Sequence, residues 1–223
     1  PAFKHLREQI NRARNNPLLS RWANDPLLWV EAFVLINFAF LALDIYLAHS
    51  TNNFRRSSEY IPLYFSLLAP LVLLAGLIAR QRFAYVAVWR DLGYLVGWLA
   101  ILIGLTGVIL HLESRFFYDN TLQSLTYAAP FAAPLAYTGL GLLLVANRMV
   151  QVESAEWAYW ILLMAVGGFV GNFAFSVTDH AVNGFFRPIE WLPVASSAFA
   201  VSFLLVPLLV KVERRYLLLC ASI

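Results

Sequence analysis

Histidines carry the clearest chemical signal in this chain, because three of its four histidines occupy one repeated sequence setting. His49 opens the stretch HSTNNFRRSSEYIP, and His180 opens the stretch HAVNGFFRPIEWLP. The two stretches share His, Asn, Phe, Arg, Glu and Pro at one constant offset, which predicts an internal repeat. His111 takes the same place in a divergent third copy, where Phe116 keeps the phenylalanine and Pro130 opens the next apolar segment.

The repeated residues are of types that bind transition metals. Neutral imidazole is a common ligand for zinc, copper and iron, and three or four protein groups usually form the ligand set. The first and second copies each add a glutamate, which would complete the ligand set or orient an imidazole. Such a site would activate water or bind redox copper or iron, although the sequence designates no catalytic residue. The metal hypothesis predicts that five side chains lie close together around one ion: His49, His111, His180, Glu59 and Glu190.

The same motif also has a purely structural interpretation. A histidine at the C-terminal end of a helix favours the helix dipole and satisfies free carbonyls. In the first copy His49 would cap a helix, Asn52 would make the turn, and Arg56 would pair with Glu59 at the membrane interface. Pro62 would then start the next helix, since proline is tolerated in a first helical turn. The second copy would use the equivalent residues His180, Asn183, Arg187, Glu190 and Pro193.

Further polar residues fall within the apolar segments. Asn37 shares a helix face with Asp44, and Asn172 shares one with Asp179. An ionisable side chain at membrane depth is costly and usually faces a polar interior. One interpretation is hydrogen bonding between helices, which stabilises a bundle by roughly 0.6 kcal/mol per bond. The other is a polar cavity that opens outward between the first and fifth segments, lined by Asp44, Asn52, Asn172, Asp179 and Asn183.

Long apolar segments must position these side chains. Hydrophobic residues make up 61% of the 223 residues and charged residues only 13%, whereas a soluble domain carries roughly 25% charged residues. Apolar runs of about 18 residues or more recur, and each can cross about 30 Å of hydrocarbon as a helix. The predicted fold class is therefore an all-α, polytopic integral membrane protein.

Six transmembrane helices are expected, arranged as three consecutive helical hairpins. Residues 1–26 are predicted to form a basic, amphipathic N-terminal segment, and residues 27–223 the transmembrane domain. The hairpins cover residues 27–79, 92–146 and 157–210. The predicted helices span residues 27–47, 60–79, 92–111, 125–146, 157–178 and 191–210.

Basic residues predict the orientation, because Lys and Arg concentrate on the cytoplasmic side. With six spans, the N-terminal segment, the second-to-third loop and the C-terminal tail are basic and share one side, so both termini are expected in the cytoplasm. Arg148 in the fourth-to-fifth loop is a weaker indicator of orientation. Glu31, at the inner edge of the first span, is expected to be solvated. The histidines at 49, 111 and 180 then lie at the extracytoplasmic ends of helices 1, 3 and 5.

Two glycine pairs, a single cysteine and several absent motifs bear on helix packing and on possible chemistry. The pairs Gly93–Gly97 and Gly167–Gly171 have the small-x-x-x-small spacing that lets helix backbones approach closely, inside one chain or between chains. Cys220 is the only cysteine, so the chain forms no intrachain disulfide and no thiolate-rich metal cluster. The sequence contains no phosphate-binding loop, dinucleotide fingerprint, nucleophile elbow or haem-attachment motif.

Three functions are consistent with these patterns. The first is a membrane protein with a histidine-containing, metal-binding site on its extracytoplasmic face, the metal being zinc, copper or iron. The second is a non-catalytic structural or assembly subunit of a larger membrane complex, and the third is a carrier for a lipid or small amphiphile. Expected partners are membrane lipids and other membrane subunits or further copies of the chain. Nucleic acid is not expected, and the expected location is a bacterial inner or intracytoplasmic membrane.

Overall fold

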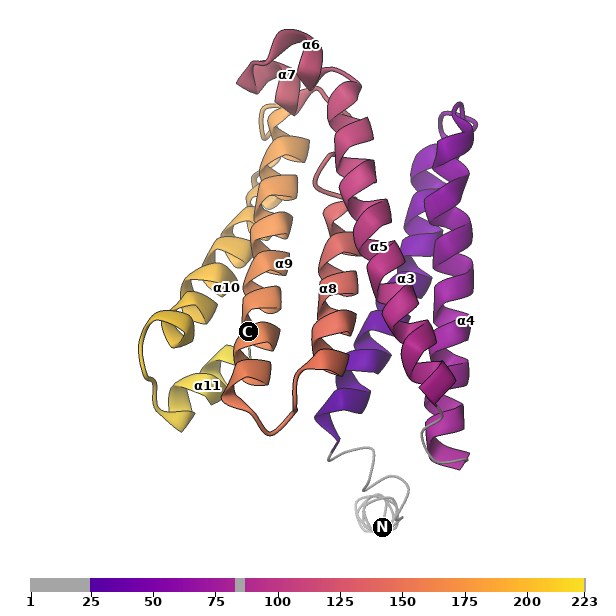
Figure 1. Ribbon diagram of the computed structural model, residues 1–223. Helices are drawn as coiled ribbons and strands as arrows, with labels where there is room; N and C mark the ends of the chain where they lie inside the picture. The colour runs from indigo at the N-terminus through magenta and orange to yellow at the C-terminus, as the bar shows by residue number, and fades with distance from the viewer. Residues whose placement is uncertain (1–24, 83–86, 223) are drawn as a thin grey trace, which may run out of the picture.

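The computed structural model describes residues 25–82 and 87–222, and that part of the chain is all-α (Figure 1). The predicted amphipathic segment, residues 1–26, lies outside the described residues apart from its last two. The short elements are η1 (Ser57–Glu59), α6 (Phe116–Asp119), α7 (Leu122–Thr126), η2 (Pro188–Glu190) and α11 (Arg214–Cys220). The long helices are α3 (Pro26–Ser50), α4 (Tyr60–Arg82), α5 (Ala87–Glu113), α8 (Leu135–Met149), α9 (Ala155–Ala181) and α10 (Trp191–Leu209).

Local capping residues decide where the helices begin. The Asp25 carboxylate accepts hydrogen bonds from the backbone N–H groups of Leu27 and Leu28, and Pro26 occupies the first helical position of α3. The Ser154 hydroxyl accepts from the backbone N–H of Trp157 and starts α9. These caps satisfy backbone donors that have no partner within the helix.

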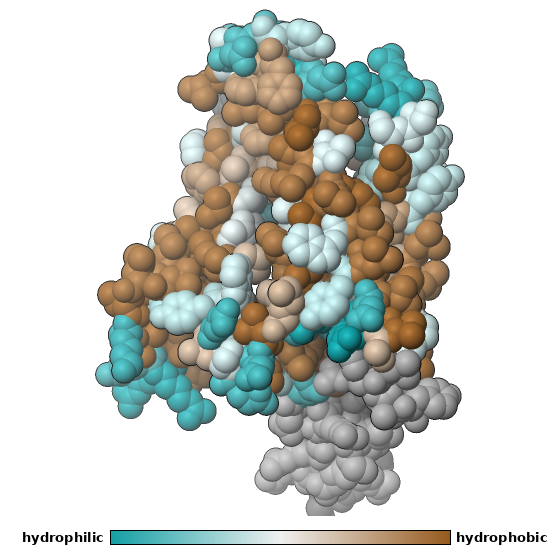
Figure 2. Space-filling view, in the orientation of Figure 1, coloured by the Kyte–Doolittle hydropathy of each residue, from teal (hydrophilic) through white to brown (hydrophobic). Residues whose placement is uncertain are grey.

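The long helices agree with an integral membrane protein. Five stretches within the described residues are long and apolar enough to cross a membrane. The space-filling view shows hydrophobic residues over the middle of the molecule and hydrophilic residues gathered near its two ends (Figure 2). The predicted first, second, third, fifth and sixth spans are confirmed as helices. The five stretches are Pro26–Ser50, Ser57–Ala79, Ala87–Glu113, Ala155–Ala181 and Pro188–Leu209.

The prediction of one continuous fourth span over residues 125–146 is wrong. Helix α7 ends at Thr126, and α8 begins only at Leu135. Pro130 and Pro134 lie in the interruption, where a proline ring offers no N–H and clashes with the preceding turn of a helix. The 15 residues of α8 extend about 22 Å at 1.5 Å per residue, which is less than the hydrocarbon thickness of about 30 Å.

The core lies among α3, α4, α5 and α8. Phe38, Leu73 and Leu144 are fully buried there, and Phe38 meets the ring of Phe65 edge-on at 5.5 Å. The hydroxyl of Tyr137 on α8 donates to the carbonyl of Pro62 at 3.0 Å, so the buried Ser66 hydroxyl donates to the Tyr137 oxygen. This chain of hydrogen bonds joins α8 to the first turns of α4.

Glycines bring α5 and α8 into backbone contact, as the Gly93–Gly97 pair predicted. A Cβ added at Gly97 would lie 2.7 Å from the Val145 side chain and 3.2 Å from the Gly141 carbonyl oxygen. A Cβ at Gly104 would lie 2.9 Å from the Pro134 carbonyl oxygen. No side chain fits at these positions without moving the helices apart, so the small residues set the distance between α5 and α8.

The α9–α10 hairpin lies at the flank of the core and contacts it mainly through α8 (Figure 1). Of the 27 residues in α9, Val166 alone is buried. A Cβ built at Gly167, Gly168 or Gly171 would meet no atom within 4 Å. The second predicted glycine pair therefore makes no close helix contact with the part of the chain that the structure describes.

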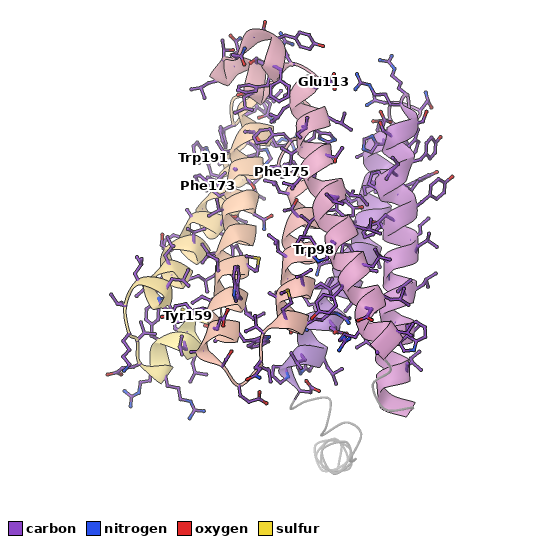
Figure 3. All side chains as sticks on the ribbon, viewed as in Figure 1. Trp98, Glu113, Tyr159, Phe173, Phe175 and Trp191 are labelled. Atoms are coloured by element: carbon purple, nitrogen blue, oxygen red, sulfur yellow. The ribbon has the colours of Figure 1, made fainter. Side chains whose placement is uncertain are left out.

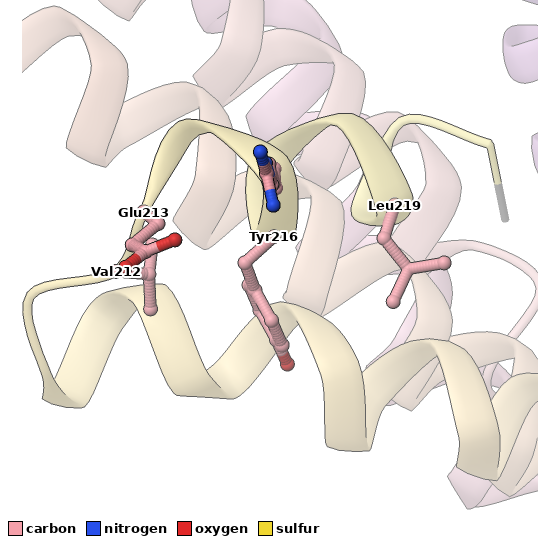
Figure 4. Close-up of a pocket in the computed structure, with 5 residues that line it drawn as sticks. Val212, Glu213, Tyr216 and Leu219 are labelled. Carbon is pink, nitrogen blue, oxygen red and sulfur yellow. The ribbon is translucent and has the colours of Figure 1, made fainter.

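The C-terminal residues fold back along α10 as α11. The Tyr216 hydroxyl donates to the Phe203 carbonyl at 2.9 Å, and the two rings stack at 6.2 Å. A shallow, open depression beside α11 is lined by Val212, Glu213, Arg215, Tyr216 and Leu219 (Figure 4). This depression lies at the end of the molecule opposite His49, His111 and His180.

Candidate functional site

The first repeated loop joins α3 to α4 through a tight reversal of the backbone. The carbonyl of His49 accepts hydrogen bonds from the N–H groups of Asn52 and Phe54, both at 3.1 Å. Asn53 and Phe54 have φ angles of 53° and 48°, in the left-handed region. That region is costly for a bulky residue, and the Phe54 ring is held there by stacking on Tyr60 at 4.5 Å.

The second repeated loop joins α9 to α10 with the same set of contacts. The carbonyl of His180 accepts from the N–H groups of Asn183 at 3.3 Å and Phe185 at 3.1 Å. Gly184 and Phe185 have φ angles of 67° and 54°, and the Phe185 ring stacks on Trp191 at 4.1 Å. Sequence reasoning assigned the turn to the asparagines, whereas the left-handed positions are the two residues that follow each of them.

Each loop places its histidine beside its glutamate. Nδ1 of His49 lies 3.3 Å from Oε2 of Glu59, and Nδ1 of His180 lies 4.0 Å from Oε2 of Glu190. The four side chains are only 12–24% exposed, and both Oε2 atoms are buried without a hydrogen bond of good geometry. Each imidazole therefore lies against a buried carboxylate oxygen without forming a well-aligned hydrogen bond to it.

The predicted ion pairs of Arg56 with Glu59 and of Arg187 with Glu190 are not found among the described residues. The backbone N–H of Arg56 contacts Oε1 of Glu59 at 3.4 Å, so Glu59 closes the start of η1. The Arg56 guanidinium instead reaches Glu113 at the end of α5, with Nη1 3.8 Å from Oε2. Arg56 consequently links the first hairpin to α5, which the motif alone did not indicate because Glu113 lies outside it.

His111 joins the first loop and not the second. Its ring centroid lies 6.3 Å from that of His49, with the ring planes at 70°. Nδ1 of His111 lies 2.9 Å from the carbonyl oxygen of Pro130, the residue that interrupts the predicted fourth span. We call the group formed by His49, Glu59, His111, Arg56 and Glu113 the outer cluster. Figure 3 labels one member, Glu113, at the end of α5.

His180 lies on a different helical hairpin from the His49–His111 pair. Helix α8 packs against both α3 and α9 and lies between them, so His180 belongs to a separate hairpin. Within residues 25–82 and 87–222, no group of three or more His, Cys, Asp and Glu side chains is arranged to hold a metal ion. The two halves of the predicted ligand set, one around His49 and one around His180, are distinct places in the fold.

The residues of the predicted polar cavity are surface residues of the chain. Asp44 and Asn52 are exposed at one end of α3, and Asn172, Asp179 and Asn183 are exposed along and just beyond α9. Asn37 was expected to bond between helices, but its amide donates to the Phe33 carbonyl of its own helix at 2.8 Å. The structure therefore separates these residues into two groups on different helices.

A buried ion pair that sequence reasoning missed lies at the opposite end of the bundle. Nη2 of Arg148 on α8 lies 3.0 Å from Oε1 of Glu31 on α3, and the side chains are only 6% and 11% exposed. Arg148 also donates to the Arg90 carbonyl at 3.3 Å. Gly93 makes room for the guanidinium, since a Cβ there would lie 2.1 Å from Cζ of Arg148. Glu31 is therefore buried and paired, and the prediction that it is solvated is wrong.

The residue before Arg148 ties the flanking hairpin to the same place. The Asn147 amide donates to the Leu27 carbonyl on α3 at 3.2 Å, and its oxygen accepts from the Trp157 indole on α9 at 3.2 Å. Asn147 is only 3% exposed. A single α8 turn thus contacts α3, α5 and α9 through polar groups, and Arg148 is part of the helix rather than of a loop.

Comparison with known proteins leaves function to the geometry of these sites. No protein-family model, curated protein or solved structure matches this chain.

Proposed function

We propose that this chain is a non-catalytic structural subunit of a membrane assembly, and that the α9–α10 hairpin packs against transmembrane helices of that assembly. The main support for this proposal is the exposed face of α9. Gly167, Gly168 and Gly171 leave open space there, and the Asn172 amide lies exposed beside them at membrane depth. Small residues and amides are typical of contacts between transmembrane helices, whereas a polar side chain facing lipid is costly.

The proposed topology has six membrane crossings, with both termini in the cytoplasm. Five crossings are the long apolar helices, and the sixth is α8 together with residues 127–134. Backbone outside a helix is tolerated at membrane depth where protein covers it. Ala132 in this segment is buried, and the Pro130 carbonyl is engaged by His111. This topology puts His49, His111 and His180 on the extracytoplasmic side.

The first and last hairpins are proposed to be copies of one ancestral unit. The support is the agreement of their loops in backbone hydrogen bonds, in left-handed residues, in ring stacking and in the His–Glu contact. In this proposal the repeated residues are retained mainly because they build the loop. The tightest helix pairs, α3–α4, α5–α8 and α9–α10, are each consecutive long helices in the chain.

The mass of the natively extracted protein tests the subunit proposal. Extraction in a mild detergent, followed by light scattering, should give a protein mass well above the 25.2 kDa of one chain. Gly168→Ile should reduce that mass, because the larger side chain fills the space that a partner helix needs. Ala39→Ile adds a similar volume to an exposed position of α3 and should leave the mass unchanged. A wild-type mass of a single chain would overturn the proposal.

A further inference from the structure

The outer cluster brings two imidazoles from different helices close together. His49 comes from the end of α3 and His111 from the end of α5, with ring centroids 6.3 Å apart. The Arg56–Glu113 contact at 3.8 Å joins the loop after His49 to the end of α5, two residues beyond His111. Because both rings lie at the ends of helices in one bundle, their separation is set by the fold.

Both rings are contacted by oxygen atoms through the same nitrogen. Nδ1 of His111 faces the Pro130 carbonyl oxygen at 2.9 Å, and Nδ1 of His49 faces a carboxylate oxygen of Glu59 at 3.3 Å. A carbonyl or carboxylate oxygen only accepts, so each contact favours a proton on Nδ1. In the neutral ring Nε2 then keeps its lone pair. Histidines that bind metals are commonly oriented in this way, by an oxygen partner on the other ring nitrogen.

The ring separation suits one ion held between the two side chains. A metal–imidazole bond of about 2.0–2.1 Å places the ion about 3.2 Å from a ring centroid. Two rings on opposite sides of one ion, as in square-planar copper coordination, are then about 6.4 Å apart, whereas two rings at the tetrahedral angle of zinc are about 5.2 Å apart. The observed separation of 6.3 Å therefore favours copper.

We propose that His49 and His111 bind one copper ion through their Nε2 atoms, with Glu59 and the Pro130 carbonyl as orienting groups. The absence of a third suitably arranged His, Cys, Asp or Glu in the described residues leaves water to fill the other coordination positions. His180 is excluded from this site, although its own contact with Glu190 resembles that of His49 with Glu59. The site is independent of the proposed assembly surface on α9.

Metal content of the purified chain tests this site. The full chain, extracted without chelator and carrying no histidine tag, is dialysed against ZnCl2 or, separately, CuCl2 and measured by elemental analysis. About one equivalent of copper should be retained per chain, since binding should follow the deprotonated imidazoles. His49→Ala should lose that equivalent, and His180→Ala is the matched control that should keep it.

A second substitution separates metal binding from folding. The His111→Asn side chain can donate to the Pro130 carbonyl as Nδ1 does, but it has no counterpart of Nε2. It should therefore lose the metal while the protein keeps its thermal stability. Retention of metal by His111→Asn, or loss of metal by His180→Ala, would overturn the two-histidine site. Light scattering on the same samples reports the assembly separately, so failure of one proposal is distinguishable from failure of the other.

Discussion

Two ion pairs in the bundle join charged residues that are far apart in the sequence. Arg56 lies next to Glu59 in the motif but reaches Glu113, and Glu31 reaches Arg148 on another helix. The two ion pairs differ in burial, because Arg56 and Glu113 are about half exposed while Arg148 and Glu31 are almost fully covered. Exposed pairs contribute little to stability, so the buried pair matters more when one partner is removed.

Arg148→Ala should lower the free energy of unfolding by about 3–5 kcal/mol, because it removes the guanidinium that pairs with the buried Glu31 carboxylate. The measurement is denaturant unfolding of the purified chain in detergent micelles. The double variant Glu31→Gln/Arg148→Met should recover most of the loss, since it removes both charges at similar volume. Arg215→Ala, at an exposed position, should change stability by no more than about 0.5 kcal/mol. Equal losses in Arg148→Ala and the double variant would contradict this account.

Helices α5 and α8 form the most extensive helix–helix contact of the bundle. Glycines on both helices remove the side chains between them, and α8 supplies polar contacts to α3 and α9 as well. The sequence predicted α5 correctly but not the bounds of α8. Pro130 and Pro134 divide the apolar segment of residues 125–146, and a hydropathy average over that segment does not detect the break.

Gly141→Ala should destabilise the chain, because the new Cβ would lie 2.5 Å from the Gly97 carbonyl oxygen and 2.9 Å from the Ile101 side chain. Backbone atoms cannot move out of the way as a flexible side chain can, so we expect a loss of about 1–3 kcal/mol. Gly76→Ala is the matched control, since its nearest atom would be 3.9 Å away. Unfolding of both variants in the same detergent provides the comparison, and similar stabilities would refute close packing at Gly141.

The candidate site was predictable in part, and the reason differs from residue to residue. The shared sequence motif pointed to His49, Glu59, His180 and Glu190, and each of its two loops brings its histidine beside its glutamate. Their grouping was not predictable, since it depends on which helices pack together. The ion pair of Glu31 with Arg148 left no signal at all, because its two residues lie in separate helices with no shared motif.

At the scale of the whole molecule the bundle is asymmetric. Four helices share one core, whereas α9 packs at its edge and α10 packs against α9. Figure 3 labels Tyr159, Phe173 and Trp191 on this flanking hairpin, and each is at least 39% exposed. An aromatic, lightly packed flank beside a compact four-helix core is what the subunit proposal requires of a surface that meets other helices.

Cysteine labelling should report how this asymmetric bundle lies in the membrane. In a Cys220→Ser background, Ser57→Cys lies in the α3–α4 loop and Ser222→Cys near the C-terminus, both at exposed positions. A membrane-impermeant maleimide added to intact cells should label Ser57→Cys, and should label Ser222→Cys only after permeabilisation. The reverse pattern would invert the proposed orientation, and labelling of both in intact cells would rule out an even number of crossings.

The pairing of Glu31 with Arg148 has a consequence for biosynthesis. A ribosome adds roughly 5–20 residues per second, so the 117 residues from position 31 to position 148 take roughly 6–23 s to make. During that interval α3 has reached the membrane, while Arg148, the α8 partner of its Glu31 side chain, has not yet been translated. The first hairpin therefore cannot reach its final packing on its own, and its completion waits for α8 to arrive. A nascent chain arrested before residue 148 should remain a substrate for membrane chaperones and quality-control proteases, whereas one arrested beyond α8 should not.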